Sequence, residues 1–111
     1  MEKIIKIIGS PVAISPSKAS LLYEHFLMVI KSGNRTEYSF EGVQDCSSAF
    51  CNASIGKLYM NCDEKVVSSL ISFTDFDEEG IWKEKVNRAI MLGSEENYRN
   101  SNQQTLEEIL A

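Results

Sequence analysis

Apolar and polar residues follow two recurring patterns along the chain. Short runs rich in β-branched and aromatic residues are typical of strands, and apolar residues at steps of three and four are typical of amphipathic helices. These patterns predict strands over residues 3–8, 36–40 and 66–73. They predict helices from Ser15-Pro16 to Gly33, from Ser47 or Ser48 through Cys62, and from Asp77 to Gly93. The repeated strand–helix order predicts an α/β fold: a small, largely parallel sheet with right-handed crossovers, flanked by helices.

The C-terminal residues differ from the rest of the chain in composition. Residues 94–104 are almost purely polar and predict a linker or a frayed tail. Thr105-Leu106-Glu107-Glu108 matches a capping box ahead of Ile109-Leu110, which predicts a short amphipathic helix. A helix this short is not stable alone, so it either docks or stays disordered. We therefore divide the chain into a domain over residues 1–93 and a tail over residues 94–111.

Length and charge restrict the classes of partner. A chain of 111 residues fits one domain, and its net charge of −5 has the wrong sign for a protein that binds phosphate backbones. We expect no nucleic-acid partner. The sequence has no apolar run of the ~20 residues that a membrane span needs, so we expect no membrane partner and a cytoplasmic location. Three cysteines without a C-x-x-C pair suit a reducing compartment.

Residue types that could support catalysis or metal binding are sparse. The lone histidine, His25, is expected to be a flanking or hydrogen-bonded core residue, because a zinc site or a catalytic triad needs further partners. The acidic residues over 75–79 lack the spacing of a calcium loop. Gly56-Lys57 lacks the remaining residues of a P-loop. We therefore expect no metal site, no cofactor and no catalytic residues.

The cysteines leave one chemical alternative open. Cys46 lies at the expected end of a strand beside a helix N-terminus, where a thiolate would be stabilised. A small buried hydrophobic residue is the competing interpretation. Cys51 and Cys62 lie on one helix face about 16 Å apart, too far to form a disulfide. A thiol-dependent enzyme using Cys46 or Cys51 would require that the folded protein react with iodoacetamide.

The most distinctive segment runs from Ser39 to Phe50, SFEGVQDCSSAF, and is followed by Gly56-Lys57-Leu58. It predicts a strand, a tight loop and two serines at the start of a helix. A serine hydroxyl in this position caps the helix, a contribution of about 1 kcal/mol. Alternatively it is a phosphorylation site, because a helix N-terminus offers free N–H groups to a phosphate.

This segment resembles the STAS domain of sulfate-transporter tails and anti-sigma factor antagonists, and more closely the stand-alone STAS-like family of bacterial proteins. The resemblance rests on the Phe-Glu-Gly-Val turn, the Ser-Ser-x-Phe helix start and the Gly-Lys-Leu that follows at that family's spacing. It covers about twenty residues by motif, and residues 1–93 by the order of elements. By analogy with the antagonists, it implies the strand order 2-1-3, with the first strand central.

The resemblance also implies a non-catalytic regulatory module. In anti-sigma antagonists a partner kinase with a histidine-kinase-like ATP-binding fold phosphorylates a serine at the start of this helix, and the phosphate breaks the complex. Carried over by position, the acceptor is Ser48, with Ser47 where the antagonists usually have Asp. Ala49 and Phe50 stand in place of their Ser-Gly, which alters the loop that such a kinase would contact.

Two functional hypotheses follow from this resemblance. In the first, Ser48 or Ser47 is a phosphoacceptor, and Asp45, Ser47, Ser48 and Phe50 form the surface that binds a protein partner. In the second, the serines only cap the helix, and the domain is a constitutive adaptor or subunit. The adaptor would then dock through the tail residues Leu106, Ile109 and Leu110. We further expect Asp75 and Asp77 to emerge at the same sheet edge and to make this rim acidic.

Overall fold

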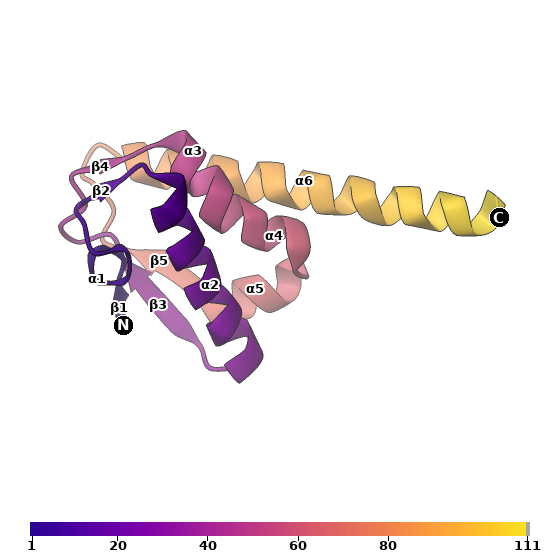
Figure 1. The fold of residues 1–111 in the computed structure, drawn as a ribbon, viewed down its shortest axis with the longest axis horizontal. Helices are drawn as coiled ribbons and strands as arrows, with labels where there is room; N and C mark the ends of the chain where they lie inside the picture. Colours follow the sequence, from indigo (N-terminus) through magenta and orange to yellow (C-terminus); the bar gives the residue numbers. More distant parts are fainter. Residues whose placement is uncertain (111) are drawn as a thin grey trace.

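The computed structural model describes residues 1–110, with side chains over residues 1–99. Its strands and helices follow one another from an N-terminal strand to a long C-terminal helix (Figure 1). In chain order they are β1 (Glu2–Lys3), α1 (Ile4–Ile8), β2 (Val12–Ala13), α2 (Pro16–Ser32), β3 (Thr36–Ser39), β4 (Asp45–Cys46), α3 (Ser48–Cys51), the π-helix η1 (Asn52–Gly56), α4 (Lys57–Asn61), α5 (Glu64–Leu70), β5 (Ile71–Thr74) and α6 (Ile81–Leu110).

Within the described residues the main sheet has three parallel strands in the order β1-β3-β5. A separate parallel pair joins β2 to β4. The structure therefore confirms the expected α/β class with a small parallel sheet flanked by helices. The expected order 2-1-3 is wrong, because the second strand, β3, is central. That order came from analogy alone, and the alternation of residues within a strand does not determine which neighbours it pairs with.

Two expected strands are largely helical. In the first run Ile4 and Ile8 are buried while Lys6 is exposed, and this i, i+4 spacing suits one helix face as well as a strand. Only Glu2–Lys3 pairs with the sheet, and Gly9 ends α1 with a φ of 71°. In the run over 66–73, the first half belongs to α5 and only the residues from Ile71 onward pair with β3.

The longest internal helix, α2, matches its prediction. The Ser15 hydroxyl accepts a hydrogen bond from the Lys18 amide at 3.2 Å, and Pro16 occupies the first helical position. The Gly33 N–H donates to the Val29 carbonyl from a left-handed conformation, which ends the helix. The buried residues of α2 recur at three- and four-residue steps and are Ala19, Leu22, Phe26 and Val29.

Aromatic side chains connect α2 to the sheet. The Phe26 ring meets Tyr38 and Phe73 edge to face, with centroids 4.9 and 6.0 Å apart. The ring nitrogen Nδ1 of His25 lies 2.7 Å from the Tyr38 hydroxyl. This bond supports the structural role expected for His25, because it satisfies a phenol that is otherwise fully buried.

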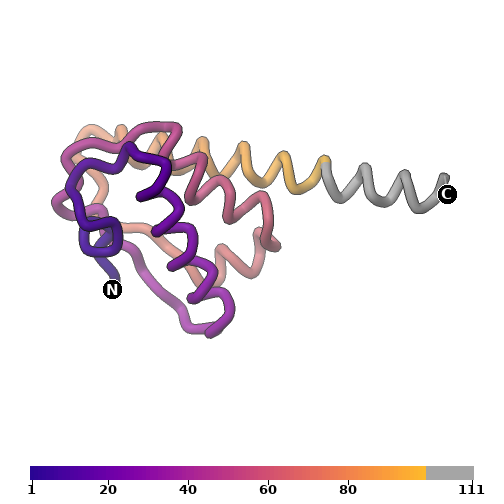
Figure 2. Tube along the Cα trace, viewed as in Figure 1, coloured from indigo at the N-terminus to yellow at the C-terminus, as the bar shows by residue number. Residues whose placement is uncertain are grey.

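The final helix does not end at Gly93 as expected, since α6 continues through this residue to Leu110. Figure 2 shows α6 running alongside the chain that forms α3, η1 and α4, and these elements are in contact. Gly93 serves there as a contact residue: a Cβ at this position would overlap the carbonyl oxygen of Gly56. The division of the chain at residue 93 stays a prediction, and the side chains of Leu106, Ile109 and Leu110 lie outside the described residues.

No helix among the described residues is both long enough and apolar enough to cross a bilayer.

Candidate functional site

The first candidate feature is the turn from β4 into α3, which contains both serines. The Ser47 amide donates to the Ala13 carbonyl of β2 at 3.1 Å, so the paired strands hold the turn in place. The Ser47 hydroxyl accepts a hydrogen bond from the Phe50 amide at 3.0 Å, and its backbone is extended, with φ −82° and ψ 154°. Ser47 is therefore the N-cap of α3.

Ser48 lies in a different environment from its neighbour. It is the first residue of α3 and its side chain is exposed, as is Asp45 on β4. Phe50 is only 2% exposed and belongs to the core, so its side chain cannot form part of the expected partner surface. The helical spacing explains this correction, because Phe50 and Cys51 lie on the inward face of α3 while Ser48 lies on the outward face.

The turn also brings two thiols together, which the sequence reasoning missed. The sulfurs of Cys46 and Cys51 lie 3.3 Å apart, and both residues are fully buried. The side-chain amine of Lys85, on α6, donates to the Cys46 carbonyl at 2.7 Å. The spacing of these cysteines matches no familiar motif, because one lies on a strand and the other on a helix.

The proximity of the thiols makes their ionisation unequal. The hydrogen bond from Cys46 lowers the pKa of Cys51, and the positive charge of Lys85 acts in the same direction against the effect of burial. The hydrogen bond to Cys51 and burial both raise the pKa of Cys46. The first proton therefore leaves from Cys51, and the Cys46 thiol donates to the resulting thiolate.

The acidic residues after β5 are engaged in the fold. A carboxylate oxygen of Asp75 accepts a hydrogen bond from the Ser39 hydroxyl at 2.6 Å, and Asp75 itself has a φ of 57°. The Asp77 carboxylate accepts from the amides of Ile81 and Trp82 at 2.9 and 2.8 Å and so caps α6. The shared acidic rim with Ser48 stays a prediction. Among the side chains described, no group of three or more His, Cys, Asp or Glu residues could hold a metal ion.

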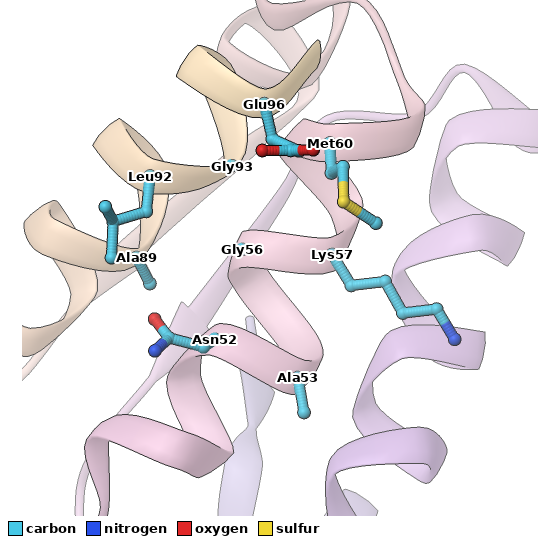
Figure 3. A pocket seen from close by; sticks show the side chains of 9 residues that line it. All are labelled: Asn52, Ala53, Gly56, Lys57, Met60, Ala89, Leu92, Gly93 and Glu96. Atoms are coloured by element: carbon cyan, nitrogen blue, oxygen red, sulfur yellow. The ribbon is translucent and has the colours of Figure 1, made fainter. Parts of the chain in front are cut away.

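Gly56-Lys57, part of the distinctive sequence pattern, lies where η1 crosses α6. A Cβ on Gly56 would lie 3.2 Å from the Ala89 carbonyl oxygen, so the absence of a side chain permits the close crossing. The Lys57 amine instead points toward α2 and lies 4.5 Å from the Tyr23 ring centroid (Figure 3). These contacts assign both residues to packing.

An open, largely apolar groove of about 390 Å³ runs beside this crossing. Figure 3 shows that η1 and α4 form one wall and α6 forms the other. Leu92 and Met60 supply apolar surface from opposite walls, and Glu96 lies at the end of the groove.

The sheet, its covering helices and the serine-bearing helix start together define a small α/β domain of the STAS-like class. The chain belongs to the family described as STAS-like domain of unknown function (DUF4325), whose sequence profile matches residues 18–80. The match includes the whole segment from β3 to the Gly-Lys-Leu pattern on which the resemblance rested. Neither the curated proteins nor the solved structures contain a match to the chain.

Proposed function

We propose that this protein is a non-catalytic protein-interaction module, and that phosphorylation of Ser48 controls its contact with a protein partner. The observation that carries the proposal is the division of roles between the two serines. The Ser47 hydroxyl is held in the N-cap, whereas Ser48 is exposed at the first position of the same helix. A kinase can therefore approach Ser48 without removing the cap.

The local charges favour an effect on binding over an effect on folding. A phosphate on Ser48 would gain about 1 kcal/mol from the helix N-terminus and would lose about as much by repulsion from acidic groups such as Asp45. The terms nearly cancel within the domain. The added charge instead changes how the exposed surface around Asp45 and Ser48 meets a partner.

The proposed partner is a serine kinase with a histidine-kinase-like ATP-binding fold, by analogy with the anti-sigma antagonists. In that arrangement the unphosphorylated module binds its partner and the phosphate separates them. The family description supports the domain class, and the exposed Ser48 supports the position of the switch.

The proposal is tested by comparing the binding partners of three variants expressed in the native cells. Ser48→Asp adds charge at the proposed switch, Ser48→Ala removes the hydroxyl, and Ser20→Asp adds the same charge to an exposed serine of α2. After cross-linking and mass spectrometry, we expect Ser48→Ala and Ser20→Asp to retain an ATP-binding kinase that Ser48→Asp loses. Retention of the same partners by all three variants would contradict the switch.

The constitutive adaptor is the second candidate, and the Ser47 cap is the observation that favours it. If both serines serve only the helix start, charge at Ser48 leaves binding unchanged. Removal of residues 100–111 would then abolish binding, because the tail would be the docking element. Under the switch proposal the shortened chain keeps its partner.

A further inference from the structure

The buried cysteine pair has no role in the proposed switch and has a chemistry of its own. Cys46 ends β4, and Cys51 ends the short helix α3. Their sulfurs are 3.3 Å apart, so they need to approach by only about 1.3 Å to reach the length of a disulfide bond. The third cysteine, Cys62, lies at the end of α4 and is partly exposed.

We propose that Cys46 and Cys51 form a reversible intramolecular disulfide when the protein is exposed to hydrogen peroxide. This reaction does not depend on the phosphorylation of Ser48. It closes a covalent ring around residues 47–50, which form the start of α3.

The surroundings of the pair assign a role to each sulfur. The Cys51 thiolate is the nucleophile, because the Cys46 thiol donates a hydrogen bond to it and the charge of Lys85 lies nearby. It attacks one peroxide oxygen, the O–O bond breaks, and a proton completes the water that leaves. The Cys46 sulfur then attacks the sulfur of the resulting sulfenic acid and the S–O bond breaks. The departing hydroxyl takes the Cys46 thiol proton and leaves as a second water, while the disulfide forms. Two thiols are oxidised and one peroxide is reduced to two waters.

Access to the buried sulfurs comes from the start of the helix. The α3 segment spans only four residues, and the π-helical turn η1 follows it directly. A π-helix is a rarer and less stable backbone geometry than an α-helix. Ser48 and Ala49 on its first turn are exposed. Fraying of this turn admits a molecule the size of hydrogen peroxide, and a thiol reductant reverses the reaction by exchange.

The test is peroxide treatment of the reduced full-length protein, followed by denaturation, alkylation and tryptic peptide mapping. Cys46 and Cys51 share the tryptic peptide 36–57, and Cys62 lies in the peptide 58–65, which serves as an internal control. We expect the alkylatable thiols to fall from three to one, the peptide 36–57 to become two hydrogens lighter, and a phosphine reductant to restore both.

The order in which the cysteines react distinguishes this proposal from oxidation by exposure alone. Cys62 is more accessible, but burial raises its pKa and no thiol partner adjoins it among the described residues. The proposal therefore requires the buried pair to react before Cys62, and Cys62→Ser to leave the pair's oxidation unchanged. Oxidation of Cys62 first, or three thiols still alkylatable after prolonged treatment, would overturn it.

Discussion

Replacing Gly93 by alanine tests the crossing of α6 over η1, and two physical effects give it opposite signs. Glycine inside a helix is unfavourable relative to alanine by about 1 kcal/mol, so helix propensity alone predicts that Gly93→Ala stabilises the protein. The structure predicts the reverse. The new Cβ would overlap the Gly56 carbonyl oxygen and would lie 3.2 Å from the Gly56 Cα, and both are backbone atoms that cannot rotate away.

The magnitude follows from the size of each effect. Overpacking a closely packed interior costs roughly 1–3 kcal/mol, and a collision with backbone belongs at the upper end of that range. After subtraction of the gain of about 1 kcal/mol in propensity, we expect a net loss of roughly 1–2 kcal/mol. For a domain of this size that lowers the Tm by roughly 5–10 °C.

The assay is thermal and urea unfolding followed by circular dichroism. Asn87→Ala is the matched control, because Asn87 is exposed on the same helix and its replacement raises helix propensity without a steric conflict. We expect Asn87→Ala to be neutral or slightly stabilising while Gly93→Ala destabilises. If Gly93→Ala is as stable as the control variant, α6 does not cross η1 at Gly93.

Three further predictions concern single side chains. Ser47→Ala removes the α3 N-cap and should destabilise the domain by about 1 kcal/mol in urea unfolding, and an unchanged midpoint would exclude the capping role. Burial first, and then the charge of Glu2, raise the pKa of Tyr38. The neutral phenol is therefore favoured in the fold, so stability is fully present below the ordinary tyrosine pKa of about 10 and falls as pH rises above it. Tyr38→Phe should flatten that alkaline loss in pH-dependent melts, and an equal slope would contradict this cause. Lys85→Gln removes a charge that lowers the pKa of Cys51 and should slow its oxidation by peroxide, measured by timed alkylation; an unchanged rate would show that this charge does not matter.

Local signals in the sequence were sufficient to predict an element where the pattern is compatible with only one structure. The Ser15-Pro16 start and the Gly33 end of α2 were predicted because a cap, a proline and a left-handed glycine each have few alternatives. The strand predicted over residues 3–8 was wrong, because the pattern of a short apolar segment fits a helix and a strand equally well. Gly93 was interpreted as a helix end, although it is needed for a contact with a residue far away in the chain.

In the candidate site, too, some features could be predicted from local sequence signals and others could not. The start of α3 at Ser48 was predictable, because serines preceding an apolar stripe are a local signal. The inward direction of Phe50 follows from its helical spacing beside Cys51, once the helix start is placed at Ser48. The Cys46–Cys51 contact depends on where β4 meets α3, and residue spacing alone does not contain it. The role of Lys85 required α6 to be placed against β4.

Phosphosite mapping is the most direct test of whether Ser48 is a regulated phosphoacceptor. The protein is isolated from its native cells in growing and in starved cultures. The tryptic peptide 36–57, which contains Ser47 and Ser48, is then fragmented to locate the phosphate. We expect phosphate on Ser48, with an occupancy that differs between the two cultures, and an unmodified Ser47. An unmodified Ser48 in both cultures, or phosphate on Ser47 instead, would contradict the proposed switch.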